Sequence, residues 1–86
     1  MLLPGVHMEG ITVTDEEIRE VIEHTPISVL DNLISEYVHD ERNQDIARRK
    51  IIKNEKFEPI SASYELTSKQ CRNIVKKIRR IIYEHL

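Results

Sequence analysis

The stretch that decides the fold is residues 57–86, FEPISASYELTSKQCRNIVKKIRRIIYEHL. Its second part repeats apolar residues at intervals of three and four, the spacing of one buried helical stripe. This set comprises Cys71, Ile74, Val75, Ile78, Ile81 and Ile82. Thr67 lies three residues before Gln70, as in a capping box. We therefore expect a long helix that begins at Ser68.

A short helix is predicted immediately before the long one. Phe57 and Ile60 supply its apolar side, and Pro59 falls in its first turn, where a missing N–H costs nothing. Only residues 65–67 separate the two helices, so the chain must change direction abruptly. Two helices joined in this way form a helix-turn-helix.

The face of the long helix opposite its apolar stripe is almost purely cationic. The outward stripe consists of Lys69, Arg72, Asn73, Lys76 and Arg80, with Ser68, Lys77 and Arg79 on its flanks. A helix that enters the major groove of DNA needs such side chains to contact phosphates and base edges. This stripe is therefore the predicted DNA-binding surface.

Residues 57–82 resemble the helix-turn-helix of the fourth conserved region of bacterial sigma factors. The matching positions are the apolar Phe57 and Ile60, the small Ser61, the aromatic Tyr64, the aliphatic Leu66 and the capping Thr67. Glu65 stands where that family usually has Gly, the residue that adopts a left-handed corner most easily. The resemblance implies that Ser68, Lys69, Arg72 and Asn73 contact promoter bases and phosphates.

The length and composition favour one small all-α domain. The chain has 86 residues, only two Gly and three Pro, and no Trp. We expect a helical bundle of four to five helices over residues 11–86 that ends in the helix-turn-helix and its long C-terminal recognition helix. A single core should join Leu30, Leu33 and Tyr37 to Ile60, Ile74 and Ile78.

Three further helices are predicted upstream of residue 57. Thr14 and Glu17 have capping-box spacing, so a first helix should run to about residue 24. We expect Thr25 to cap a second helix that Pro26 opens. A third helix should begin near Asp40, and Asn54 should end that helix in the left-handed conformation.

The first ten residues show no helical periodicity and contain both glycines of the chain. Residues 1–10 are therefore expected to form a flexible arm, or to include an expression scar ahead of a native Met8. A strand over residues 11–13 is possible, but it would have no partner strand.

Charge is distributed unevenly along the chain. Residues 1–45 carry 11 Asp and Glu against 2 Lys and Arg, whereas residues 46–86 carry 4 acidic residues against 11 basic ones. Such a division indicates a basic binding surface with an acidic counterpart, although solvated helix faces are the simpler alternative. Because acidic helices repel phosphate, we expect the first half to face away from DNA and to contact protein.

Catalysis and metal binding are not expected. His39, Asp40 and Glu41 are adjacent, so they point in different directions on a helix, and the other histidines lack zinc-motif spacing. The single Cys71 lies on the apolar stripe and is predicted to be buried. No cofactor motif and no long apolar run occurs, so we expect no membrane partner and a cytoplasmic protein.

The predicted function is sequence-specific binding of double-stranded DNA in transcription regulation. Arg48, Arg49 and Lys53 are expected to reach phosphates. The chain has no room for the region that melts promoter DNA, so the resemblance implies a free-standing regulator like the small sigma-like proteins of phages and mobile elements. The alternative is an adaptor that docks on RNA polymerase or a ribonucleoprotein without reading DNA.

The C-terminal residues leave a choice between core and interface. The end of the long helix carries more apolar residues than a core of this size needs, namely Ile81, Ile82, Tyr83 and Leu86. We favour the interpretation that they close the core against the second helix. A homodimer contact is the alternative.

Overall fold

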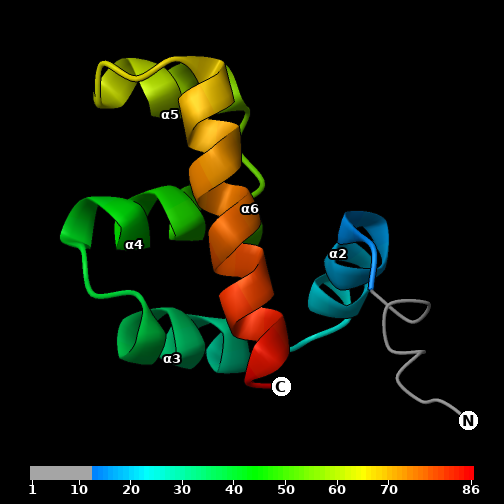
Figure 1. The fold of residues 1–86 in the computed structure, drawn as a ribbon. Helices are drawn as coiled ribbons and strands as arrows, with labels where there is room; N and C mark the ends of the chain where they lie inside the picture. The colour runs from blue at the N-terminus through cyan, green and yellow to red at the C-terminus, as the bar shows by residue number, and fades with distance from the viewer. Residues whose placement is uncertain (1–12) are drawn as a thin grey trace, which may run out of the picture.

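The computed structural model of the protein describes residues 13–86, which form helices and no strand (Figure 1). The elements are α2 (Asp15–Glu23), α3 (Ile27–Tyr37), α4 (Glu41–Ala47), the π-helical turn η1 (Arg48–Ile52), α5 (Phe57–Ser63) and α6 (Ser68–Glu84). The predicted all-α class is therefore confirmed. The expected arm at residues 1–10 and most of the possible strand lie outside the described residues.

The long helix α6 is the centre of the arrangement. It packs against α2, α3, α4 and α5. In Figure 1, α5 lies at the N-terminal end of α6, α4 and α3 follow along one side, and α2 stands on the other side. The helix-turn-helix is therefore one end of the molecule, while the two acidic N-terminal helices surround the other end of α6.

Local hydrogen bonds set the starts of three helices where the sequence predicts them. Thr14 caps α2 with Glu17, and Thr67 caps α6 with Gln70, each pair in a complete capping box. Asp40 caps α4 by accepting from the backbone N–H groups at positions 42 and 43. Side-chain capping satisfies donors that the first helical turn leaves free.

The expected cap at Thr25 is wrong. The N-cap of α3 is Pro26, and no side chain caps it. The Thr25 hydroxyl instead donates to the carbonyl oxygen of Val21 at 2.8 Å, so this side chain completes the end of α2. Pro26 can open α3 without a cap because its fixed φ already suits a helix start.

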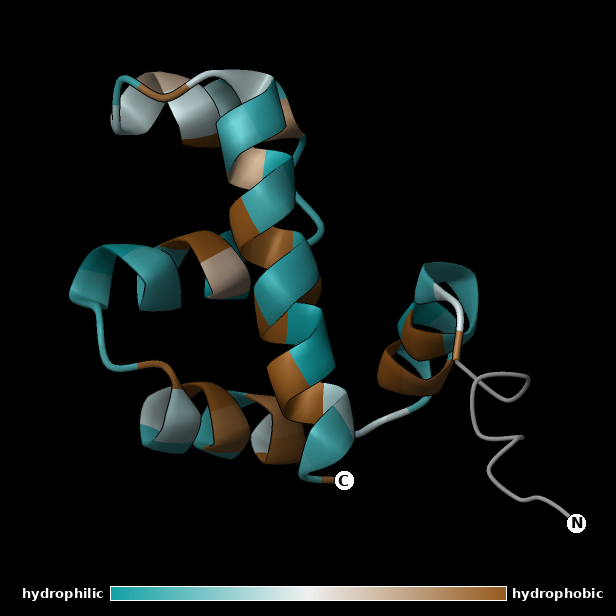
Figure 2. Cartoon of the chain, in the orientation of Figure 1, coloured by the Kyte–Doolittle hydropathy of each residue, from teal (hydrophilic) through white to brown (hydrophobic). Residues whose placement is uncertain are grey.

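The interior consists of two clusters rather than the single core predicted from the sequence. The larger cluster contains Ile18, Ile22, Leu30, Ile34, Val38, Ala47, Ile78 and Ile82, and the smaller contains Ile46, Ile60, Cys71 and Val75. Ile51 and Ile74 pack against both. The clusters are separate because α3 and α5 lie at opposite ends of α6 (Figure 2), so Leu30 and Ile60 cannot meet. Figure 2 colours the ribbon by hydropathy, and along α6 hydrophobic segments alternate with hydrophilic ones.

The C-terminal residues are divided between core and surface. Ile82 is fully buried and Tyr83 packs against the larger cluster, as expected for a closing layer. Leu86 is 49% exposed. Tyr37 was expected in the core but is exposed, and its ring stacks on that of His85 with 3.7 Å between centroids.

Both sharp corners use the left-handed conformation. Asn54 has φ of 57° and follows η1, as predicted, and Glu65 has φ of 55° in the turn of the helix-turn-helix. In that turn the N–H of Leu66 bonds the carbonyl of Ser61 at 2.9 Å, and the N–H of Glu65 bonds the carbonyl of Ala62 at 3.4 Å. These two bonds form a Schellman motif. The corner therefore keeps its geometry although Glu65 replaces the usual Gly.

The third helix contains an unpredicted wide turn. It starts after Asp40 as expected, but η1 interrupts its regular geometry, and the N–H of Lys53 reaches back five residues to the carbonyl of Arg48 at 3.0 Å. One extra residue in a turn rotates all following side chains about the helix axis. Lys50 and Ile51 owe their positions to this turn.

Glu65→Gly should stabilise the fold. A residue with a Cβ pays about 1 kcal/mol in the left-handed region, which Gly avoids. Asn54→Gly is the matched control, and its effect should be smaller because Asn tolerates this conformation. Urea unfolding at equilibrium measures both. A loss of stability in the Glu65 variant exceeding that of the Asn54 variant would show that the Glu65 side chain itself stabilises the corner.

Candidate nucleic-acid interface

The N-terminal half of α6 is held rigidly from its buried side. Cys71 and Val75 are fully buried in the smaller cluster, so the opposite face must point outward. Lys69, Arg72 and Asn73 lie on that face and are exposed. On the flanks of the face, Lys77 is exposed and Ser68 is partly exposed. Among the described residues no carboxylate forms an ion pair with these side chains. This half of the predicted DNA-binding stripe is therefore accessible.

The first helix of the helix-turn-helix is fixed against its neighbours. The Tyr64 hydroxyl donates a hydrogen bond to the carboxylate of Asp45 in α4, and this bond raises the pKa of Tyr64. Ile60 of α5 is fully buried in the smaller cluster, together with Cys71 and Val75 of α6. The helix α5 is thus held to α4 by a polar contact and to α6 by an apolar one, and this support preorganises the outer face of α6.

The C-terminal part of the stripe is neutralised by a carboxylate of α2. Asp15 lies 3.1 Å from the Nζ of Lys76 and 3.3 Å from a guanidinium nitrogen of Arg80. The hydrogen bond from Lys76 is the main reason why the pKa of the Asp15 carboxyl is lowered, and the charge of Arg80 adds to it. Lys76 and Arg80 are therefore less available to phosphate than their position on the stripe suggests.

The packing of the helices brings the acidic helix α2 beside the basic helix α6. Ile18 and Ile22 of α2 are buried in one cluster with Ile78 and Ile82 of α6. Burying such side chains is worth about 1.5–3 kcal/mol each, more than exposed charge pairs contribute. The apolar contact therefore brings the acidic helix beside the cationic stripe.

Two of the three upstream cations predicted to reach phosphates are engaged within the fold. Arg48 lies 2.7 Å from Asp31 and also donates to the Ser35 hydroxyl at 2.6 Å. Arg49 lies 3.0 Å from Glu55, 3.9 Å from Asp45 and 3.0 Å from the hydroxyl of Ser63. These arginines tie η1 to α3, α4 and α5, so fewer of their donors are left for phosphate than the sequence suggests.

Lys53 differs from those arginines. It is exposed, and none of the ion pairs in residues 13–86 includes it. The contact of Lys53 with phosphate therefore stays a prediction.

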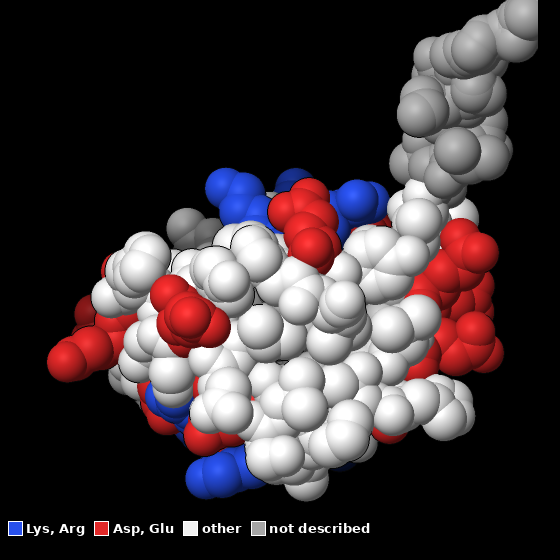
Figure 3. All heavy atoms as spheres, turned by 90° about the horizontal axis from the view of Figure 1, so that it is seen from below, with Lys and Arg blue, Asp and Glu red and all other residues white. Residues whose placement is uncertain are grey.

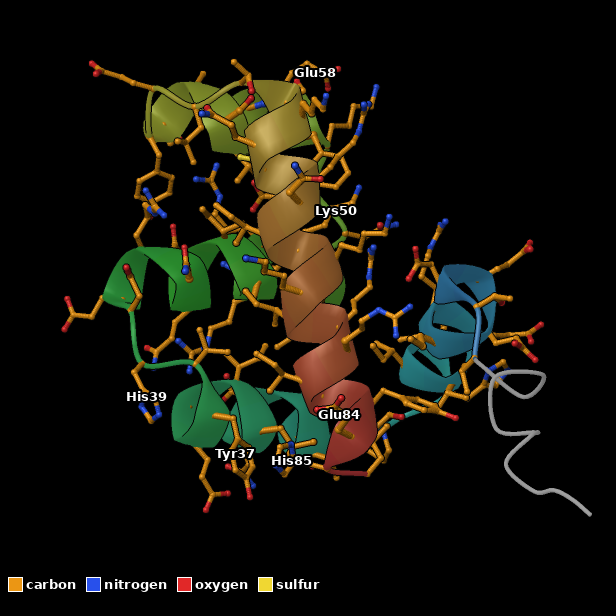
Figure 4. The ribbon with its side chains drawn as sticks, viewed as in Figure 1. Tyr37, His39, Lys50, Glu58, Glu84 and His85 are labelled. Carbon is orange, nitrogen blue, oxygen red and sulfur yellow. The ribbon has the colours of Figure 1, made fainter. Side chains whose placement is uncertain are left out.

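A groove of about 420 Å³ opens beside the accessible part of α6. Its walls come from α2, η1, α5 and α6, and it is lined by Asp15, Arg19, Lys50, Phe57, Lys69, Arg72, Asn73, Lys76 and Arg79. Figure 4 shows Lys50 beside the N-terminal half of α6. Six of the nine lining residues are cationic and one is acidic, so the groove favours anions.

Sequence reasoning missed two cations of this groove. Arg19 is one of only two basic residues in the acidic half, and this isolation was its only signal. Lys50 lies in the wide turn η1, and no local pattern predicts which way such a turn directs a side chain. Two cations approach one aromatic ring here, with the Nζ of Lys50 at 4.4 Å and the guanidinium of Arg72 at 5.4 Å from the ring centre of Phe57.

The described residues hold no group of three or more metal-ligating side chains. None of their helices combines the length and the apolar character that a membrane span requires. Comparisons of the chain with protein-family models, with curated proteins and with solved structures gave no match. The similarity of residues 57–82 to sigma region four therefore stays a prediction from the residues themselves.

Lys76→Gln should raise the pKa of Asp15 towards its ordinary value of 3.8. The pKa of Asp15 is lower in the folded state than in the unfolded state. Its ion pairs therefore stabilise the fold at any pH above the unfolded pKa, and this stabilisation is lost as the pH falls through the folded pKa. Carboxyl NMR titration measures the shift, with Lys77→Gln as the control. A pKa of Asp15 that stays low in the Lys76 variant would assign the effect to Arg80.

Proposed function

We propose that the protein binds double-stranded DNA sequence-specifically, with the N-terminal half of α6 in the major groove, and that it regulates transcription. The observation that supports this most directly is the exposed face of Lys69, Arg72, Asn73 and Lys77 on the second helix of a rigid helix-turn-helix. Recognition helices contact base edges with their N-terminal residues. These side chains occupy that part of α6.

The roles of individual side chains follow from their hydrogen-bonding groups. The Arg72 guanidinium suits the two acceptors of guanine, and the Asn73 amide suits adenine. Ser68, Lys69 and Lys77 would contact phosphates and fix the register, and Lys53 could extend this contact on one side. Arg48 and Arg49 are assigned no phosphate because they are paired within the fold.

The position of α2 limits how DNA can approach. Asp15, Glu16 and Glu17 lie in the first turn of α2, and Asp15 contacts α6 at Lys76 and Arg80. These carboxylates repel phosphate, so the duplex would meet α6 from its α5 end. The bases read would then be those facing residues 68–77.

The role in transcription rests on the resemblance of residues 57–82 to sigma region four. A free-standing regulator of this kind would also contact RNA polymerase. The face formed by α3 and the C-terminal residues suits a protein partner or a second copy, because it exposes Ile27, Val29, Tyr37 and Leu86. Figure 3 shows this side of the molecule as a broad, mostly uncharged area with Asp and Glu towards its edges.

The same face favours the second candidate function, an adaptor that docks on polymerase or a ribonucleoprotein without reading DNA sequence. The two functions differ in one measurable property. Selection of bound duplexes from a random pool should give a consensus sequence for the first. Sequence-blind, salt-sensitive DNA affinity together with polymerase binding would support the adaptor instead.

Arg72→Ala should weaken binding to the selected sequence by about 1–3 kcal/mol and relax the preference at one base position. Lys77→Ala is the matched control on the same helix. It should weaken binding to all sequences alike and reduce the slope of log affinity against log salt concentration by about one unit. Titration of both variants against the consensus and single-base variants tests this. Equal, sequence-independent losses in both would rule out base reading by Arg72.

Val29→Asp should abolish self-association or polymerase binding while DNA affinity and fold persist, because Val29 is 38% exposed on α3. Ile34 and Val38 are buried, so they cannot serve this test. Val21→Asp on α2, where the side chain is 42% exposed, is the control. Sedimentation and a polymerase pull-down measure the effect. Unchanged association in the Val29 variant would remove this face from the proposal.

A further inference from the structure

Three cations from three different helical elements converge in the wall of the groove. Arg19 comes from α2, Lys50 from η1 and Arg79 from α6. All three line the groove of about 420 Å³ and also an adjoining hollow of about 330 Å³ on the side of α3. Residues distant in sequence are thus brought to one place by the packing of the helices.

These cations lack carboxylate partners. No ion pair within the described part of the chain includes Arg19, Lys50 or Arg79. Burial lowers the pKa of Lys50, and the charges of Arg79 and Arg19 lower it further. Burial and the charge of Arg19 likewise lower the pKa of Arg79. The three groups therefore repel one another in a partly desolvated place.

The acidic residues nearby form no ion pair with these three cations, although Glu16, Glu20 and Glu23 line a hollow of α2 together with Arg19. Asp15 is shared between Lys76 and Arg80. Glu23 favours the charged form of Arg79, and Glu58 favours that of Lys50, but neither carboxylate forms an ion pair with them. A groove whose lining carries an excess of positive charge attracts anions.

A purely structural explanation accounts for only one of the three cations. The Nζ of Lys50 lies over the ring of Phe57 and donates to the backbone carbonyl of Glu55 at 3.0 Å. Its stem and one donor are therefore used by the fold. No side-chain hydrogen bond within residues 13–86 involves Arg19 or Arg79, so the donors of both guanidinium groups remain available.

We propose that the groove at Arg19, Lys50 and Arg79 binds a phosphate group. Two guanidinium groups and one ammonium group offer forked and single donors, the combination that suits the oxygens of a phosphate. The phosphate could belong to the DNA backbone or to a free phosphate compound, and the chemistry of the site is the same for both. The proposal does not depend on base reading, because none of these three residues is assigned to a base.

The first test is thermal unfolding of the whole chain in inorganic phosphate and in chloride at equal ionic strength. In chloride, Arg79→Gln should unfold at the same or a higher temperature than the unchanged protein, because repulsion is relieved. Phosphate should raise the unfolding temperature of the unchanged protein and of the control Lys56→Gln, and this rise should be lost in Arg79→Gln. That pattern identifies a free phosphate as a ligand.

The second test is titration with duplex DNA over a range of salt concentrations. If the occupant is a backbone phosphate, Arg79→Gln should weaken binding to all sequences alike and flatten the salt dependence by about one unit of slope, whereas Lys56→Gln should change it less. Base preference should not change, so this result is distinct from failure of the helix to read bases. Arg19→Gln, at an exposed position of α2, provides a second variant if Arg79→Gln does not fold. Equal behaviour of the groove variants and Lys56→Gln in both tests would overturn the proposal.

Discussion

The buried stripe of α6 is the constraint on which the rest of the structure depends. Cys71 and Val75 hold the helix-turn-helix end, and Ile78 and Ile82 hold the N-terminal helices. Because α5, α4, α3 and α2 all pack on this one helix, its rotation about its own axis determines which side chains point outward. The accessible cations at residues 69–77 are placed by the apolar residues on the other side of the same turns.

The same packing produces an electrostatic division along α6. Ile18 and Ile22 dock α2 on the C-terminal half of the helix, and Asp15 then meets Lys76 and Arg80. The N-terminal half keeps its charge. A stripe that is uniform in sequence therefore becomes two regions, one free to meet an anion and one already paired, and the boundary is set by an apolar contact rather than by the charges.

Features that depend on neighbours in sequence were predictable, and features that depend on tertiary packing were not. The capping boxes at Thr14 and Thr67 and the helix start near Asp40 each depend on only four consecutive positions, and the structure confirms them. The pairing of Arg48 with Asp31 joins residues 17 apart, and the contact of Asp15 with Arg80 joins residues 65 apart. Periodicity correctly identified the apolar face of α6. It did not determine which faces would meet, so it predicted one core where there are two and missed the cationic groove.

The wide turn η1 has a consequence for how the chain tolerates changes of length. Side chains before and after one extra residue in a helix are out of phase by about 100°. Ile46, before the turn, is fully buried in the smaller cluster, whereas Lys50, within it, lines the groove. In an uninterrupted α-helix, residues four positions apart lie on the same face, so Ile46 and Lys50 could not point in these two directions. Deletion of a single residue between positions 48 and 52 would therefore force a choice between the packing of Ile46 and the direction of Lys50, although every helix of the protein would still be able to form.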